Sequence, residues 1–190
     1  LEEMERWTHQ LRGVRGDKFP EARTGPEGTI LPEGTIAIGC SDDYESAVGI
    51  LRHDDILLPH WKEFVDAFAL YLKHHRDHEI RYYLMIINFE LQSQVINILA
   101  PILSIIDQFA LGANSLSNRD VQAVFGASHG IKNIIISQNN IGSEGIALIA
   151  NFLTSNPPLE YLLRNRTSLN DEDTIMLANA LRTNTRLGQL

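Results

Sequence analysis

Residues 131–158 read IKNIIISQNNIGSEGIALIANFLTSNPP, and residues 159–186, LEYLLRNRTSLNDEDTIMLANALRTNTR, repeat their pattern at an offset of 28 residues. Aliphatic residues at the start of the two stretches coincide, and five later positions hold identical residues. The identical pairs are Glu144 and Glu172, Ala150 and Ala178, Asn151 and Asn179, Leu153 and Leu181, and Asn156 and Asn184. The region therefore contains a repeated structural unit.

Each unit begins with an L-x-x-L-x-L-x-x-N-x-L pattern, in which other aliphatic residues can replace Leu. In the first stretch, Ile134 and Ile136 are the alternating residues of a short strand, and Asn139 and Ile141 complete the pattern. Apolar residues at helical spacing follow. The unit is thus expected to be a strand, a turn and a helix. Helix caps are expected at Ser93, Ser117 or Asn118, Ser143, and Asp171.

The pattern also fits upstream, from Ile106 and, with looser agreement, from Ile80. The predicted units span about 80–105, 106–130, 131–158 and 159–186, and their strands lie near 82–86, 108–112, 133–137 and 161–164. Asn88, Asn114 and Asn139 are expected to bond backbone groups that the turn would otherwise leave unpaired. The fourth unit departs from the pattern, because Arg164 replaces an aliphatic residue and Thr167 replaces the asparagine.

These units, with N-x-I-G-S-E-G-I-A-L-I-A-N-F-L at 139–153 and L-N-D-E-D-T-I-M-L-A-N-A-L-R at 169–182, resemble the ribonuclease-inhibitor type of leucine-rich repeat. The resemblance extends from about residue 80 to residue 190. It implies an α/β solenoid with parallel strands on the concave side and helices on the convex side. It also implies a protein-binding module or scaffold. One branch of the family activates small GTPases, so a GTPase regulator is an alternative, although no residue here aligns with such a motif.

The N-terminal part divides into a loop-rich segment, residues 1–50, and a helical cap, residues 51–79. The cap has Pro59 in its first turn and an apolar face that includes Trp61 and Phe68. Ile30, Ile36 and Ile38 are consistent with a short hairpin. Leu187 begins a fifth unit, so further repeats or another subunit are expected to cover the C-terminal end.

Composition narrows the class of partner. The formal net charge is −8, and 16 of the 24 acidic residues lie in residues 1–79. An acidic chain without a basic face has no electrostatic attraction for nucleic acid or anionic lipid, so neither is an expected partner. The single cysteine, Cys40, excludes an intramolecular disulfide, and no run resembles a signal peptide or a membrane span. A cytoplasmic location is expected.

Three features invite a catalytic or metal-binding interpretation. His74 and His78 have a spacing that can bind zinc, but they stand where a helix ends and cations complement the helix dipole. Asp42, Asp43 and Glu45 do not have the spacing of a calcium loop, and Cys40 has no basic neighbour. We therefore expect no metal, no cofactor and no catalytic residue. An enzyme with a site in residues 1–50 is the remaining alternative.

The functional site is instead expected on the concave face, where strand residues between the buried positions point outward. The candidate protein-binding residues are Tyr82, Leu84, Gln108, Ala110, Asn133, Ile135, Tyr161 and Leu163. Their column of Leu84, Ala110, Ile135 and Leu163 is apolar and has tyrosines at its flank, which is typical of an interface core. The alternative is that the chain's own N-terminal segment covers this face.

Overall fold

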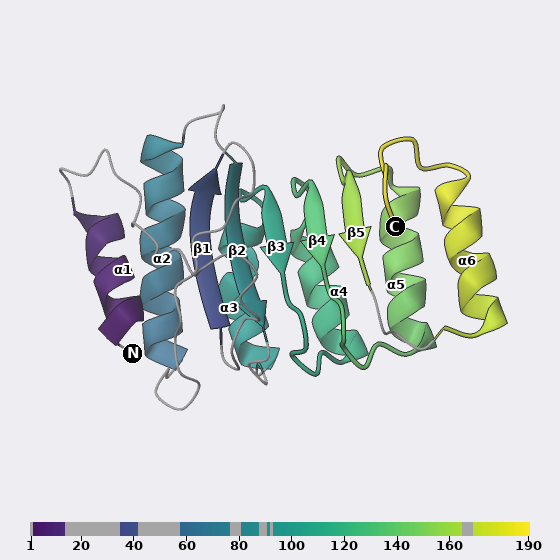
Figure 1. The fold of residues 1–190 in the computed structure, drawn as a ribbon, viewed down its shortest axis with the longest axis horizontal. Helices are drawn as coiled ribbons and strands as arrows, with labels where there is room; N and C mark the ends of the chain where they lie inside the picture. Colours follow the sequence, from purple (N-terminus) through teal and green to yellow (C-terminus); the bar gives the residue numbers. More distant parts are fainter. Residues whose placement is uncertain are drawn as a thin grey trace, which may run out of the picture.

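The structure of the chain is a computed structural model that describes residues 2–13, 35–41, 58–76, 81–87, 91, 93–164 and 169–190 (Figure 1). The helices in these ranges are α1 (Glu2–Arg12), α2 (Leu58–His75), α3 (Ser93–Leu103), α4 (Asn118–Ala127), α5 (Ser143–Thr154) and α6 (Asp171–Leu181). The strands are β1 (Thr35–Ser41), β2 (Arg81–Ile87), β3 (Gln108–Ala110), β4 (Asn133–Ile135) and β5 (Tyr161–Leu163). The expected α/β class is confirmed.

The strands form one open sheet in the order β1-β2-β3-β4-β5. Strands β2 to β5 are parallel, and a helix follows each of them. Strand β1 pairs antiparallel with β2 along its whole length, so residues Ile36 and Ile38 belong to the edge of this sheet. Strands β3 and β4 are shorter than expected, because Asn114 and Asn139 already bond the carbonyls of Gly112 and Ser137 in the following turns.

The helices form a second layer in which each one packs on the next, from α1 to α6 (Figure 1). The chain termini lie toward opposite ends of this arrangement. Between the layers lie side chains that are fully buried, among them Leu84, Phe109, Ile134 and Leu162. A parallel strand needs a crossover connection, and here each crossover supplies a helix that covers the sheet.

Helix α2 lies within the region expected to form the cap and buries the expected aromatic face. Trp61, Phe64 and Phe68 are nearly inaccessible to water, and the ring centroids of Phe64 and Phe68 are 5.8 Å apart. Trp7 of α1 reaches the same cluster, with its ring 6.2 Å from that of Phe64. Burial of each such side chain contributes about 1.5–3 kcal/mol. No helix among the described ranges combines the length and apolar character that crossing a membrane requires.

The helix caps agree with the sequence at Ser117 and differ by one residue at two other helices. Ser117 caps α4 and forms a reciprocal capping box with Asp120. The caps of α5 and α6 are Gly142 and Asn170, so the prediction of Ser143 and Asp171 was wrong. At α6 the reason is that the Asn170 side chain accepts the backbone N–H of Asp173 at 2.8 Å, while Asp173 accepts that of Asn170.

Helix α5 is capped by a residue from the preceding unit. Its third position is Gly145, where α4 and α6 carry Asp120 and Asp173, so no carboxylate of its own can accept the N–H of Gly142. The Asn118 side chain accepts this N–H at 3.3 Å, and Asn118 also donates to Glu144 at 3.1 Å. A Cβ on Gly145 would lie 2.7 Å from the same Asn118 oxygen. The glycine therefore makes room for a cap supplied by a neighbour.

The asparagines predicted to organise the turns do so in both units where the structure describes them. Asn139 Oδ1 accepts the backbone N–H of Asn114 at 2.9 Å and of Leu116 at 3.1 Å, and its amide nitrogen donates to the carbonyl of Leu111 at 2.6 Å. Asn114 donates in the same way to the carbonyl of Ile86. Each asparagine thus bonds the unit before it. Asn88 lies outside the described residues.

Candidate functional site

The candidate site is the front face, which we define as the side of the sheet turned away from α3 and α4 (Figure 1). Side chains alternate along a strand, so the residues on either side of Phe109 and Ile134, and Tyr161 before Leu162, face the front. Strand pairing aligns them in two rows. The polar row contains Tyr83, Gln108, Asn133 and Tyr161, and the apolar row contains Met85, Ala110, Ile135 and Leu163.

Two of the predicted residues were assigned to the wrong face. Leu84 pairs with Phe109, and Tyr82 lies two residues earlier on the same strand, so both belong to the helix-covered side. Tyr82 is 2% exposed and Leu84 0%. Their places in the rows are taken by Tyr83 and Met85, which the sequence analysis missed. The other six predicted residues hold the expected register, that of Leu163 being known from its backbone pairing.

The wrong assignment of Tyr82 and Leu84 has a physical cause. A shift of one residue moves every side chain of a strand to the opposite face, and the apolar pattern normally decides between the two choices. From Tyr82 to Ile86 every residue of β2 is apolar or aromatic, so both registers look equally buried. The pattern could not identify the inward face of this strand.

Exposure differs between residues of the front face. Tyr83 is 3% exposed and Ala110 0%, whereas Met85, Gln108, Asn133, Ile135 and Tyr161 are half-buried. The face is therefore covered at Tyr83 and Ala110. The part over β3, β4 and β5 remains accessible to a partner.

Two amide side chains stand next to each other in the accessible part of the polar row. Gln108 and Asn133 are Cα partners on neighbouring strands. Within the described part of the chain, neither side-chain amide forms a hydrogen bond, although both are half-buried. An amide offers two donors and an acceptor, so these groups can bind a polar ligand.

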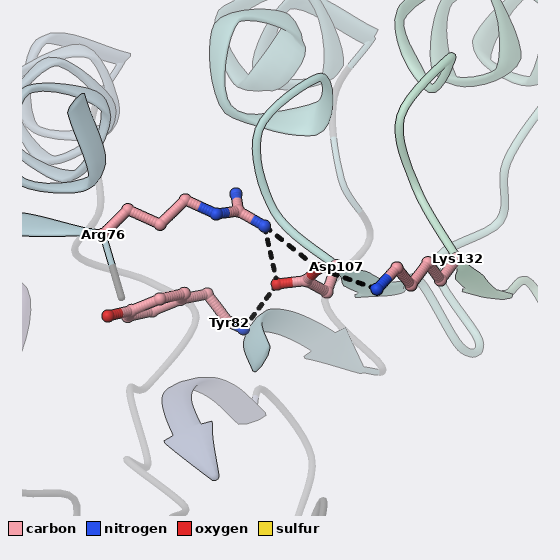
Figure 2. Close-up of polar contacts among 4 residues, drawn as sticks. All are labelled: Arg76, Tyr82, Asp107 and Lys132. Atoms are coloured by element: carbon pink, nitrogen blue, oxygen red, sulfur yellow. Dashed lines mark hydrogen bonds and ion pairs between the residues drawn. The ribbon is translucent and has the colours of Figure 1, made fainter. Parts of the chain in front are cut away.

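A charged cluster lies where strands β2, β3 and β4 begin (Figure 2). The buried carboxylate of Asp107 accepts Arg76 Nη2 at 3.0 Å on both oxygens and the backbone N–H of Tyr82 at 2.9 Å. Lys132 Nζ lies 4.0 Å away on the other side. The Arg76 guanidinium also lies 5.9 Å from the centroid of the Tyr82 ring. The cluster thus joins the end of α2 to the starts of β2, β3 and β4.

Asp107, Lys132 and Glu160 occupy the same register position in successive units. The N–H of Lys132 donates to the carbonyl of Asp107 at 3.0 Å, and the N–H of Glu160 to that of Lys132 at 2.7 Å. Sequence reasoning missed this cluster, although the alternation of acid, base and acid just before three predicted strands was visible. It places charges of alternating sign just before β3, β4 and β5.

Two groups near the turns have shifted pKa values. Burial alone would raise the pKa of Asp120, but hydrogen bonds from Ser117 and Ser93 and the charge of Arg119 outweigh it, so the pKa lies below its ordinary value. Burial lowers the pKa of the Arg164 guanidinium. Arg164 stands where the other units bury Leu111 and Ile136, which explains its desolvation.

The remaining candidates do not assemble into a site. The His75 ring lies 5.2 Å from that of Tyr71 and is exposed, while His78 and the acidic run Asp42, Asp43 and Glu45 lie outside the described residues. No three metal-ligating side chains come together in the part of the chain that the structure describes. A groove of about 270 Å³ between α1 and α2 is bordered by the 3.6 Å pair of Arg12 and Glu63.

No protein-family model matches the chain, and no curated protein is similar to it in sequence.

Proposed function

We propose that residues from about 80 to 190 form a leucine-rich-repeat solenoid of the ribonuclease-inhibitor type that binds another protein through its front face. The proposal is supported by a strand–helix unit that recurs along the chain and by asparagines that bond the preceding unit at equivalent positions. Repeat proteins of this architecture present a broad surface to their partners. A cytoplasmic location and the absence of catalysis remain predictions.

The observation that carries the proposal is the accessible part of the front face, formed by Gln108, Asn133, Ile135 and Tyr161. None of these four side chains is charged, and they combine an aromatic ring, an aliphatic side chain and two amides. Cores of protein interfaces are depleted in charge and enriched in tyrosine. A protein surface fits this face better than a phosphate-rich or highly charged ligand.

The proposal is tested by capture from native extract with the intact chain and with Ile135→Glu and Tyr161→Glu variants. Both substitutions introduce a charge on the front face, so a bound protein should be lost while the free energy of unfolding changes by less than about 1 kcal/mol. Asn151→Glu, on the exposed side of α5, is the matched control and should retain the partner. Partners captured equally by all four proteins would contradict the proposal.

Ile134→Glu separates folding from binding. Ile134 is 0% exposed and faces the helices, so a carboxylate there would be buried without a partner and should destabilise the chain by more than about 4 kcal/mol. Thermal melting followed by circular dichroism measures the difference. If Ile135→Glu were as destabilising as Ile134→Glu, the front face would be part of the folded core.

A further inference from the structure

The outer side of α6 has the same residues with which α5 binds a neighbouring helix. Because the sequence repeats at 28 residues, Ala178 and Leu181 of α6 are the equivalents of Ala150 and Leu153 of α5. Ala150 is 5% exposed and Leu153 0%, whereas Ala178 is exposed and Leu181 is half-buried. The difference arises because α6 covers α5, while no described helix packs on the other side of α6 (Figure 1). A helix-binding face of α6 is therefore left open.

Large apolar side chains are exposed at the same end of the molecule. Three such side chains are exposed among the described residues, and two of them are Ile175, at 60%, and Leu190, at 42%. Ile175 belongs to α6, and Leu190 follows Gln189, which pairs with Tyr161 on the outer side of β5. Apolar side chains exposed at one end of a protein indicate an interaction site more than single ones scattered over its surface.

The open side of α6 carries opposite charges at its two ends. Asp171 is the first residue of the helix and Arg182 is its C-cap, so the two residues are roughly 16 Å apart along the axis. Eleven residues complete about three turns, which places both on the same side of the helix, close to Ala178. Both are exposed, and neither forms an ion pair with another described residue.

This charge pattern is complementary to itself in one orientation. If two copies of α6 pack antiparallel, with Thr174 of one beside Ala178 of the other, Asp171 of each copy lies near Arg182 of the other. A parallel arrangement would instead bring equal charges together. A two-fold axis generates the antiparallel arrangement and forms both opposite-charge contacts at once. The small side chains at the centre allow the two helices to approach closely.

We propose that two copies of this chain associate through the outer side of α6, with the two helices antiparallel and with Asp171 of each copy paired to Arg182 of the other. A second copy is the occupant because the charges of this face complement themselves. Only 8 of the 24 acidic residues lie in residues 80–190, so the two C-terminal parts repel each other weakly. The surface is separate from the front face, and the proposal does not depend on the proposed function.

Sedimentation equilibrium of the full chain tests the association. A contact of one helix is small beside the interfaces of stable dimers, so the concentrations should extend to about 0.5 mM. The chain should dimerise, and Ala178→Glu, which places two carboxylates at the centre of the contact, should weaken the dimer at least about tenfold. Asn179→Glu is the matched control, because its equivalent Asn151 stays exposed between packed helices, and it should dimerise normally. Circular dichroism checks that both variants are folded.

Exchange of the two charges tests the orientation. Asp171→Arg and Arg182→Asp should each weaken the dimer about tenfold, because equal charges then meet across the contact. The double variant, in which the charges are exchanged, should dimerise again. A mixture of the two single variants should also associate, because each variant then offers the charge that the other needs. An effect within one helix cannot explain restoration by mixing.

Four results would contradict the proposal. The first is a chain that stays monomeric at every concentration, and the second is a dimer that Ala178→Glu leaves intact or that Ile135→Glu disrupts in its place. The third is a failure of both the double variant and the mixture to restore association, which would exclude the antiparallel pairing. The fourth is a monomer that binds a different protein through α6 and loses it in Ala178→Glu, since the occupant would then not be a second copy.

Discussion

Asn139 shows how much one side chain contributes when its hydrogen bonds replace those of a turn. It is 4% exposed and accepts two backbone N–H groups of the preceding unit, besides donating to carbonyls of both units. In Asn139→Ala these groups remain buried without partners. We expect the free energy of unfolding to fall by about 1–3 kcal/mol, measured by urea denaturation. Asn140→Ala, at the exposed neighbouring position, should change it little, and equal losses would contradict this role.

Replacement of glycine by alanine is expected to have opposite effects on stability at Gly145 and at Gly126. Alanine is normally better than glycine inside a helix by about 1 kcal/mol. A Cβ at Gly126 meets nothing within 4 Å, so Gly126→Ala should stabilise the chain. At Gly145 the Cβ would lie 2.6 Å from Ile141 Cγ2 and 2.7 Å from Asn118 Oδ1, so Gly145→Ala should destabilise it by about 1–3 kcal/mol.

The Asn118 cap can be separated from the crowding at Gly145 by a double-mutant cycle. Asn118→Ala removes both the cap of α5 and the oxygen that a Cβ at Gly145 would approach. Gly145→Ala should therefore cost less in the Asn118→Ala background than in the native chain. Identical costs in the two backgrounds would show that Ile141 alone restricts this position.

At the scale of elements, Asp120 caps α4 and connects it to α3. Its pKa is below the ordinary value, so the charged form favours the folded state. This contribution is fully present above the ordinary value and is lost as the pH falls through the folded pKa. In Asp120→Asn the free energy of unfolding should be lower at neutral pH and should decline less steeply below about pH 4. Acid titration of stability checks this, with exposed Asp66→Asn as the control.

Arg76 connects helix α2 to the sheet. It bonds both oxygens of Asp107, whose carboxylate is buried at the start of β3. Arg76→Ala leaves that carboxylate with the backbone N–H of Tyr82 and the more distant Lys132. We expect a loss of about 1–3 kcal/mol in the free energy of unfolding. Lys73→Ala, exposed one turn earlier on α2, should have little effect, and equal losses would show that the pair does not stabilise the chain.

The elements differ in how far the sequence predicts them. Strands β4 and β5 and helices α5 and α6 lie where the 28-residue repeat predicts them, because matching residues recur in both units and fix the register between them. Strand β2 is found, but its inward face is not, since both of its faces are apolar. The Arg76–Asp107 ion pair joins residues that are 31 positions apart, so no local sequence pattern predicts it.

At the scale of the whole molecule, the sequence predicts an α/β chain with helices on one side of a parallel sheet, and the structure confirms this class. It does not predict that residues 35–41 extend the sheet by an antiparallel strand, because strand order depends on contacts between distant segments. The candidate site is predicted over β3, β4 and β5 and misplaced over β2. Its accessible part could not be known beforehand, since exposure depends on how the whole chain covers the sheet.

A duplicated unit would contain the asparagine that bonds it to the unit before it. Asn139 bonds Leu111 by the same contact through which Asn114 bonds Ile86, so a copied unit meets, on its predecessor, the groups that its own asparagine requires. Residues 131–158 and 159–186 match as such an event would leave them, although Thr167 has replaced the asparagine in the second of these units. A gene encoding this chain can thus change the span of its sheet in steps of one unit, without new contacts having to evolve at each junction.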